Sequence, residues 1–171
     1  EFDVVVLGGG FSGISSALRV SELGGRVCLV EKHKVGRKGF IRRNAVLMEN
    51  RSSVFSTDNW EEHKNILSLE ADTFSLSMID KLSLAGVTIV EGEGELSDSR
   101  EVNVLVNGHE RVGLKGKSII LANGSEAQFP ATLPHEENVV ISIEEISTLQ
   151  KLPEKILVVG GNSYGCETAL G

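Results

Sequence analysis

Three glycines near the start of the chain have the spacing that a phosphate-binding turn requires. Gly8, Gly10 and Gly13 follow the apolar run Phe2–Leu7 and lead into a helical pattern that begins at Ile14. The first glycine permits a tight turn, the second a close approach of the backbone to a pyrophosphate, and the third close packing of the helix on the strand. The helix points free N–H groups and the positive end of its dipole at the phosphates. The predicted contact residues are Gly8, Gly10, Phe11, Ser12 and Gly13.

An acidic residue extends this pattern. The run Arg26–Val30 is typical of a second buried strand, and it ends at Glu31, eighteen residues after Gly13. An acid at the tip of that strand can accept hydrogen bonds from a ribose diol. An ordinary glycine-rich strand–helix turn would explain the glycines alone. The strand before them, the helix after them and the acid at this spacing favour a βαβ unit that binds a dinucleotide.

Composition limits the possible functions. The chain has 171 residues, of which 40% are hydrophobic and 24% charged, as in a globular domain. Its net charge of −7 argues against nucleic acid or an anionic membrane as the main partner, and no apolar run approaches the length of a membrane span. Cys28 and Cys166 do not form a disulfide framework, so we expect a reduced, cytoplasmic protein.

A basic segment, residues 32–43, follows Glu31 and contains Gly36. It leaves the second strand at the same sheet edge as the glycine turn, so it could contact cofactor phosphates, or it could be a solvated charged loop. His33 has no partner at metal-ligand spacing and is interpreted as a surface histidine. No residue is assigned a catalytic or metal-binding role.

The next part of the chain predicts a helix-rich stretch followed by strands. A short helix at 44–48, a polar loop at 51–59 and a long helix at 60–85, with a possible break near Asp72, precede a strand at 87–90. Strands at 101–106 and 110–114, joined by an Asn-Gly turn, and a core strand at 117–122 complete the pattern. The fold class is therefore α/β, with a parallel sheet and a small antiparallel β-meander.

The last third of the chain repeats the opening design. A short strand at 138–141 and a Ser142–Glu145 capping box precede an apolar strand at 155–159, which leads into Gly160 and Gly165. Asn162 stands where the middle glycine of the motif would be. We expect residues 1–152 to form one incomplete dinucleotide-binding domain and residues 153–171 to begin a second Rossmann-like domain of a longer protein. The alternative is that the last strand joins the edge of the first sheet.

Four blocks together resemble the N-terminal part of the flavoproteins that have two dinucleotide-binding domains, specifically the dihydrolipoamide dehydrogenase and glutathione reductase group. The blocks are residues 2–13 with Glu31-Lys32, residues 87–96, residues 119–126 with Pro130, and residues 152–167. They occur in the family's order and span essentially the whole chain, which makes the resemblance more specific than any single motif.

The resemblance implies that the first motif binds FAD and that the second belongs to an NAD(P)H domain of a homodimeric oxidoreductase. Glu31 and Lys32 would lie at the adenosine ribose, and the backbone at Gly94 and Glu95 near the adenine. The other residues that it implies near a cofactor are Ala122, Asn123, Gly124, Gly160 and Gly165.

The chain also departs from the family. The positions of the two redox cysteines fall on Gly39 and Asn44, which cannot form a thiolate or a disulfide. Three hypotheses follow: an FAD-dependent NAD(P)H oxidoreductase whose acceptor is not a disulfide, a catalytically inactive dinucleotide-binding or interaction module, and dihydrolipoamide dehydrogenase itself. The missing cysteines oppose the third. The electron acceptor and the choice between NADH and NADPH are not encoded in these residues.

Overall fold

The computed structural model describes residues 1–47 and 60–170. The chain divides into two compact units, Glu1–Gly39 with Ala71–Ser125 and Phe40–Glu70 with Glu126–Gly171, and each is described by itself. The polar loop predicted at 51–59 lies outside the described residues. The short helix predicted at 44–48 is the end of a longer helix that begins at Arg37, within the segment predicted as a loop, and that is described as far as Leu47.

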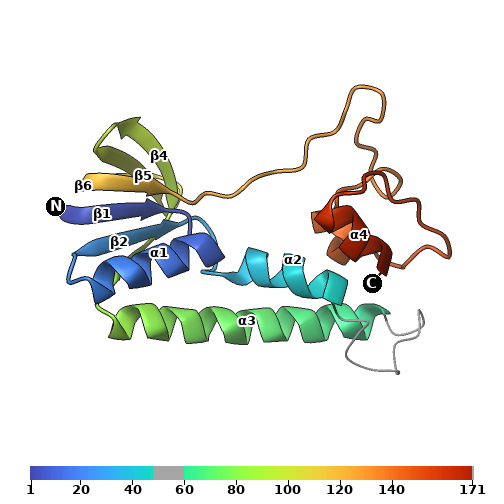
Figure 1. Cartoon of the computed structure of the whole chain (residues 1–171), viewed down its shortest axis with the longest axis horizontal. Helices are drawn as coiled ribbons and strands as arrows, with labels where there is room; N and C mark the ends of the chain where they lie inside the picture. Colours follow the sequence, from blue (N-terminus) through green and yellow to red (C-terminus); the bar gives the residue numbers. More distant parts are fainter. Residues whose placement is uncertain (48–59, 171) are drawn as a thin grey trace. The chain divides into compact units, whose positions relative to one another are not determined.

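The first unit is built on a six-stranded sheet with the order β3-β2-β1-β6-β5-β4 (Figure 1). The strands are β1 (Phe2–Leu7), β2 (Val27–Glu31), β3 (Thr88–Glu91), β4 (Glu93–Asp98), β5 (Glu101–Val106) and β6 (Glu110–Leu121). β3, β2, β1 and β6 are parallel neighbours, whereas β4 and β5 extend the sheet in antiparallel fashion. The predicted α/β class, with a parallel sheet and an antiparallel meander, is confirmed.

The strand register fixes where the functional loops emerge. Leu7 pairs with Val30 on one side and with Leu121 on the other, so β1, β2 and β6 end at the same level. The segments that follow these three strands therefore leave the same edge of the sheet, which is where ligands bind in open parallel sheets.

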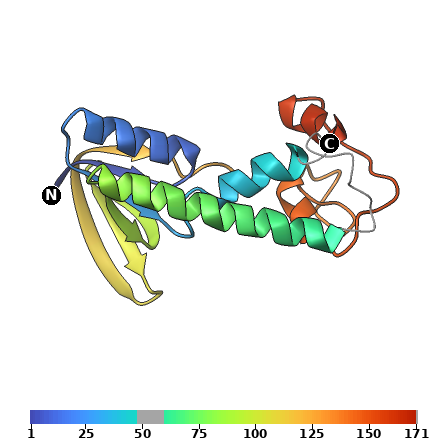
Figure 2. The same ribbon diagram turned by 90° about the horizontal axis from the view of Figure 1, so that it is seen from below.

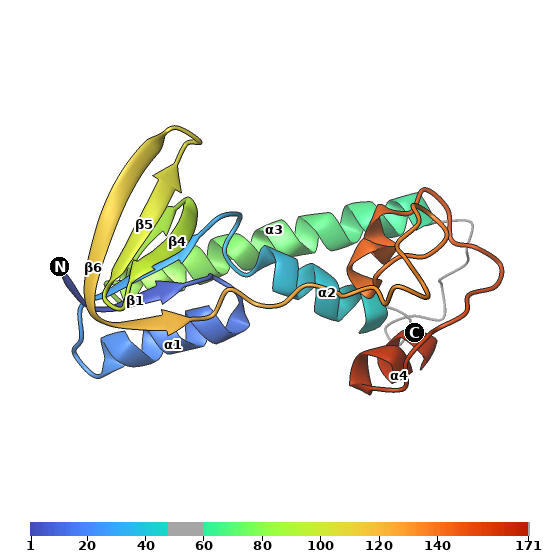
Figure 3. The ribbon, with the colours of Figure 1, turned by 90° about the horizontal axis from the view of Figure 1, so that it is seen from above.

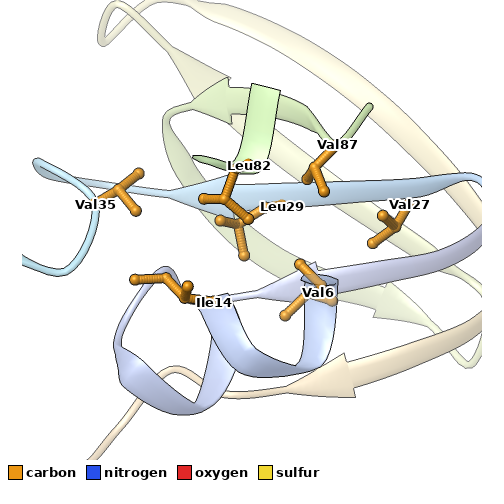
Figure 4. Packing of buried hydrophobic residues seen from close by; sticks show 8 residues of the cluster. Val6, Ile14, Val27, Leu29, Val35, Leu82 and Val87 are labelled. Carbon is orange, nitrogen blue, oxygen red and sulfur yellow. The ribbon is translucent and has the colours of Figure 1, made fainter. Parts of the chain in front are cut away.

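Helix α1 (Phe11–Glu22) covers one face of this sheet (Figures 1 and 2). The part of α3 (Trp60–Leu84) that belongs to the first unit covers the same face. Val6 and Leu29 from the strands, Ile14 from α1 and Leu82 from α3 meet in one buried cluster (Figure 4). Strands buried on both faces have near-continuous apolar sequences, which explains the runs in β1 and β2.

The opposite face is covered by the meander. Val5 and Cys28 of the parallel strands pack with Val102, Val104 and Leu114. β6 makes this possible because it is one continuous strand that runs from the meander into the parallel sheet (Figure 3). The sequence predicted two separate strands here, at 110–114 and 117–122. Lys115 and Gly116 join them instead, because both positions keep strand partners.

Helix α3 is also more regular than its sequence suggests. The break considered near Asp72 does not occur. The carboxylate of Asp72 accepts hydrogen bonds from Lys34 Nζ at 3.0 Å and Arg37 Nε at 2.7 Å, so its polar group is satisfied outside the helix. A polar side chain with external partners does not compete with the backbone hydrogen bonds of the helix.

The second unit contains most of α2 (Arg37–Leu47), the 3-10 helix η3 (Ile143–Thr148) and α4 (Ser163–Leu170). The predicted capping box is confirmed: Ser142 N–H donates to Glu145 Oε2 at 2.7 Å. The hydrogen bond from the amide of Ser142 is the main reason that the pKa of Glu145 is lowered below 4.5.

Two strands predicted in this unit do not form. Residues 138–141 contribute only an isolated bridge between Glu136 and Val140, and residues 155–159 are neither helix nor strand. The alternative in which the latter segment joins the first sheet is also wrong, because all six strands of the sheet come from other residues. A strand needs a neighbour for its backbone groups, and the segment has none among the described strands. Ile156, Leu157 and Val159 are accordingly exposed.

In the described ranges, no helix is both long and apolar enough to cross a membrane.

Candidate nucleotide-binding site

The turn between β1 and α1 has the conformation that its glycines predict. Gly8 adopts a φ of +105°, which favours glycine, and its N–H donates to the carbonyl of Val30 at 2.8 Å. A Cβ at Gly8 would collide with the carbonyl group of Ala122, and one at Gly13 would collide with the carbonyl oxygen of Gly8. The turn therefore packs closely against the residue that follows β6 and against the start of its own helix, with no room for a side chain at Gly8 or Gly13.

The middle glycine is different, because it faces open space. A Cβ at Gly10 would meet no atom within 4 Å, and its φ of −72° is accessible to any residue. Gly10 is the N-cap of α1, and no side chain in the described part of the chain caps this end. The amides of Phe11, Ser12 and Gly13, which have no partner within the helix, are therefore available to a ligand such as a phosphate.

Glu31 is held against this turn. Its Oε2 accepts a hydrogen bond from Gly9 N–H at 2.5 Å, and its Oε1 accepts one from His33 N–H at 2.8 Å. A Cβ at Gly9 would lie 2.9 Å from the Glu31 side chain, so glycine is needed here as well. Each carboxylate oxygen has two acceptor sites, so Glu31 retains acceptor capacity for ribose hydroxyls.

The segment after β6 forms another side of the site. Ala122 N–H donates to the carbonyl of Leu7 at 2.7 Å, which continues the ladder one residue beyond β6. The next residues, Asn123 and Gly124, are exposed, and Gly124 has a φ of +78°. The structure therefore brings the predicted residues Ala122, Asn123 and Gly124 to the same sheet edge as Gly8.

The basic segment is tied to the turn by its backbone. Gly36 N–H donates to the carbonyl of Gly9 at 2.7 Å, and Gly36 adopts a φ of +72°. A Cβ at Gly36 would lie 2.7 Å from the ring of Phe74. That ring packs edge-to-face on Phe11, with centroids 5.7 Å apart. Sequence reasoning missed this aromatic pair, because no local pattern relates residues 11 and 74.

Carboxylates engage the cations of the segment. Lys34 and Arg37 form ion pairs with Asp72. Their hydrogen bonds lower the pKa of Asp72 below its ordinary value of 3.8, and the bond from Lys34 has the largest effect. Lys32 Nζ lies 2.7 Å from Glu93 Oε1, which places Lys32 beside the start of β4.

The predicted adenine-side residues lie on β4. A Cβ at Gly94 would collide with Leu7 and lie 3.1 Å from Val30, so glycine lets β4 pack closely on β1 and β2. Glu95 is exposed and pairs with Asn103 of β5. Within the described residues, Glu95 makes no hydrogen bond to the glycine turn.

The second glycine motif, residues 160–165, lies in the other unit and has the same backbone design. Gly160 adopts a φ of +120°, and a Cβ at Gly165 would collide with the carbonyl oxygen of Gly160. Cys166 N–H donates to the carbonyl of Asn162 at 2.9 Å, as Ile14 N–H does to Gly10 in the first motif. The difference is a side chain: Asn162 Oδ1 accepts a hydrogen bond from Gly165 N–H at 3.0 Å.

An arginine from α2 fixes the helix of this second motif. The Arg42 guanidinium lies 4.4 Å from the ring centroid of Tyr164, and Arg42 Nη1 lies 3.0 Å from Glu144 Oε1. Cation–π contacts at this distance are stabilising. Sequence reasoning missed this cluster too, since its members lie in three separate segments.

The cysteines do not supply a redox pair. Cys28 is fully buried in β2, where burial raises the pKa of its thiol to about 11, whereas Cys166 is exposed on α4; both are free thiols. The positions aligned with the family's cysteines have other contacts. A Cβ at Gly39 would lie 3.3 Å from the Phe11 ring, and Asn44 Nδ2 donates to the carbonyl of Phe40 at 2.9 Å.

A comparison with protein families decides the classification. The family described as pyridine nucleotide-disulphide oxidoreductase matches residues 2–170. The chain belongs to this family. Its members use FAD and a pyridine nucleotide, in agreement with the resemblance that the sequence blocks carry.

Individual members of the pyridine nucleotide-disulphide oxidoreductase family support this. The dihydrolipoyl dehydrogenase of Chlamydia muridarum is 29% identical over 98% of this chain and 40% of the relative, and that of Bacillus subtilis is 28% identical over 99% and 41%. The leghemoglobin reductase of Glycine max is 26% identical over 98% and 36%. The chain thus spans well under half the length of these relatives.

Solved structures share the fold. LpdA from Mycobacterium tuberculosis matches with a TM-score of 0.68 at 19% identity, over 88% of this chain and 38% of that one. The flavoprotein disulfide reductase RclA from Escherichia coli matches with a TM-score of 0.62 at 14% identity, over 77% and 30%.

Proposed function

We propose that this chain is the FAD-binding part of an NAD(P)H-dependent flavoprotein oxidoreductase. The observation that carries the proposal is the uncapped N-terminus of α1 beside Glu31, at the carboxyl edge of a parallel sheet. Family membership supports FAD as the dinucleotide at this position.

The residues present fit the two polar parts of the cofactor. The amides of Phe11, Ser12 and Gly13 would donate to the pyrophosphate, where the α1 dipole also favours negative charge. The remaining acceptor sites of Glu31 would take the adenosine ribose hydroxyls. When bound, FAD supplies the hydride-accepting group. The chain's own residues bind and orient it.

The proposal extends to the arrangement of the whole protein. Residues 1–152 would form an incomplete FAD-binding domain, and residues 153–171 would begin a domain for NAD(P)H, with Gly160 and Gly165 in its glycine turn. The coverage of the relatives, 40% and 36% of their lengths, supports such a division. The family likeness favours a homodimer, and the two separate cysteines favour a cytoplasmic location.

The acceptor that we propose is not a disulfide. Gly39 and Asn44 occupy the positions of the family's cysteine pair, and Cys28 lies in the core with a pKa of about 11. A thiol with so high a pKa is inert as a nucleophile at neutral pH. The electron acceptor would instead be a quinone, oxygen or a small carrier.

Reconstitution with FAD tests the binding proposal. The chain is mixed with excess FAD and desalted, and absorbance in the flavin bands is measured together with the quenching of flavin fluorescence. We expect retained flavin in the native chain and in Glu110→Gln, which removes an exposed carboxylate from the far end of the meander. Glu31→Gln should lower the affinity about tenfold or more, since glutamine has one acceptor oxygen for two backbone donors. A whole protein that retains no flavin under the same conditions would refute the proposal.

A second candidate is a catalytically inactive dinucleotide-binding module of the same fold. Two departures from the family favour it: Gly39 and Asn44 stand at the cysteine positions, and Asn162 stands at the middle glycine of the second motif. NAD(P)H oxidation by the FAD-loaded whole protein, with oxygen and quinones as acceptors, separates the two: turnover supports the oxidoreductase, and flavin binding without turnover supports the inactive module.

Restoring the thiols tests the third hypothesis, a dihydrolipoamide dehydrogenase. Gly39→Cys with Asn44→Cys in the whole protein should give a dithiol. A gain of lipoamide turnover would mean that only the thiols are missing. We expect dithiol formation without that gain, because Phe11 lies against position 39 and would crowd the new side chain.

A further inference from the structure

The second glycine motif carries a contact that the first lacks. In the first motif the amides at the start of α1 have no side-chain cap among the described residues, and position 10 faces open space. In the second motif Asn162 holds the equivalent position, and its side chain turns back on the helix that follows.

The contact uses a donor that a phosphate would need. Asn162 is the N-cap of α4, and its Oδ1 accepts the N–H of Gly165, the third residue of the helix, at 3.0 Å. The amides of the first three helical residues have no partner within a helix. They are also the donors that a pyrophosphate binds at such a motif. Asparagine is among the best N-cap residues, so the contact is energetically favourable.

The backbone around Asn162 otherwise has the conformation of the first motif. Gly165 packs on the carbonyl oxygen of Gly160 as Gly13 packs on that of Gly8. Arg42 over the ring of Tyr164 holds the first turn of α4, which itself remains helical. Ser163 and Tyr164 also differ from Phe11 and Ser12, but Asn162 is the residue that caps the helix, and it stands in the position of the open Gly10.

We propose that Asn162 is a built-in cap that competes with the pyrophosphate of a pyridine nucleotide for the amides of α4. Asn162 would thereby set the affinity of the second motif. A nucleotide must displace Oδ1 from Gly165 N–H before its phosphate can take that donor. This inference rests on the proposed assignment of the second motif to a pyridine nucleotide.

Substitutions at position 162 distinguish two effects of Asn162 on a bound nucleotide: competition of its Oδ1 for the helix amides, and steric hindrance by its Cβ. Asn162→Ala removes the acceptor and keeps a Cβ, Asn162→Gly removes both, and Asn162→Asp keeps the acceptor and adds a negative charge. An N-cap contact is worth about a factor of five in an equilibrium, so Asn162→Ala should bind nucleotide about fivefold more tightly than the native chain. Asn162→Gly should also bind more tightly, and Asn162→Asp more weakly.

The measurement is a titration of the whole protein, labelled with ¹⁵N at glycine, with NADH and, separately, with inorganic pyrophosphate, with the amide of Gly165 as the reporter. Equal affinities in the native chain and Asn162→Ala, including no response in either, would overturn the proposal. So would tighter binding by Asn162→Gly alone, which would indicate crowding, or weaker binding by Asn162→Ala, which would make Asn162 a ligand. The reporter lies in the second motif, whereas FAD binding is measured at the first. Either proposal can therefore fail while the other holds.

Discussion

The two glycine motifs of this chain share a backbone and differ at the residue that precedes the helix. Both begin with a glycine of positive φ, +105° at Gly8 and +120° at Gly160, and both place their last glycine against the carbonyl of the first. In the first, Gly10 leaves the helix start open, whereas in the second Asn162 caps it. The outer glycines are thus enough for the shape of the turn, whereas the residue at the N-cap determines whether a side chain occupies an amide of the helix start.

Matched substitutions of the last glycine should give the largest effect. Gly13→Ala places a methyl group on the backbone of Gly8, so the turn must shift and we expect loss of FAD binding with a destabilisation of about 1–3 kcal/mol or more. Gly165→Ala makes the same collision with Gly160 in the other unit. It should leave FAD binding unchanged. Flavin absorbance after desalting and thermal unfolding check both. Equal loss of flavin in the two variants would contradict the assignment of FAD to the first motif.

Transfer of the cap to the first motif should have a smaller effect. Gly10→Asn fits the φ of −72° and the open space at this position, so the fold should be retained. The new side chain would take the amide of Gly13 and weaken FAD binding about fivefold.

Gly10→Ala is the control for that variant, because it adds bulk without an acceptor and should weaken binding less. Affinities come from the quenching of flavin fluorescence. An Asn variant with native affinity would show that an N-cap does not govern access to such a turn.

The smallest effect concerns the ion pairs that fix the basic segment beside the first motif. The pKa of Asp72 is lowered below 3.8 by Lys34 and Arg37, so the stabilisation is present above pH 3.8 and lost as the pH falls through the lowered pKa. Asp72→Asn should lower the urea midpoint slightly at neutral pH, and the difference should shrink as the pH falls below 3.8 and the Asp72 carboxylate is protonated.

The salt dependence of stability should also differ between Asp72 in the first unit and Glu145 in the second. The pKa of Glu145 is lowered mainly by the amide of Ser142 rather than by cations. High salt should therefore reduce the effect of Asp72→Asn and leave that of Glu145→Gln nearly unchanged, because screening acts on exposed charge pairs. Equal salt dependence would contradict these causes.

The first unit was largely predictable because its signals are local. The apolar runs of β1 and β2, the glycine spacing and Glu31 lie within one βαβ unit, and their residues fix both the turn and the sheet edge. The contacts between distant residues were not predictable. The Phe11–Phe74 pair and the Asp72 ion pairs depend on where α3 lies, which no short-range pattern specifies.

The second unit was predicted less well, for a physical reason. The apolar run 155–159 has the composition of a core strand, but a strand forms only where a neighbour satisfies its backbone. The capping box at Ser142 and the turn at Gly160 did form, because each depends on only a few adjacent residues. The place of Asn162 in the motif could be read from the glycine spacing, but its hydrogen bond to Gly165 could not.

The most direct test of the central claim is a titration of the ¹⁵N-labelled native chain with FAD, followed at the amides of both motifs. The account predicts saturable shifts at Gly9, Ser12 and Gly13 and an unchanged resonance for Gly165 at the same FAD concentrations. Shifts at Gly165 without shifts at Ser12 and Gly13 would contradict it.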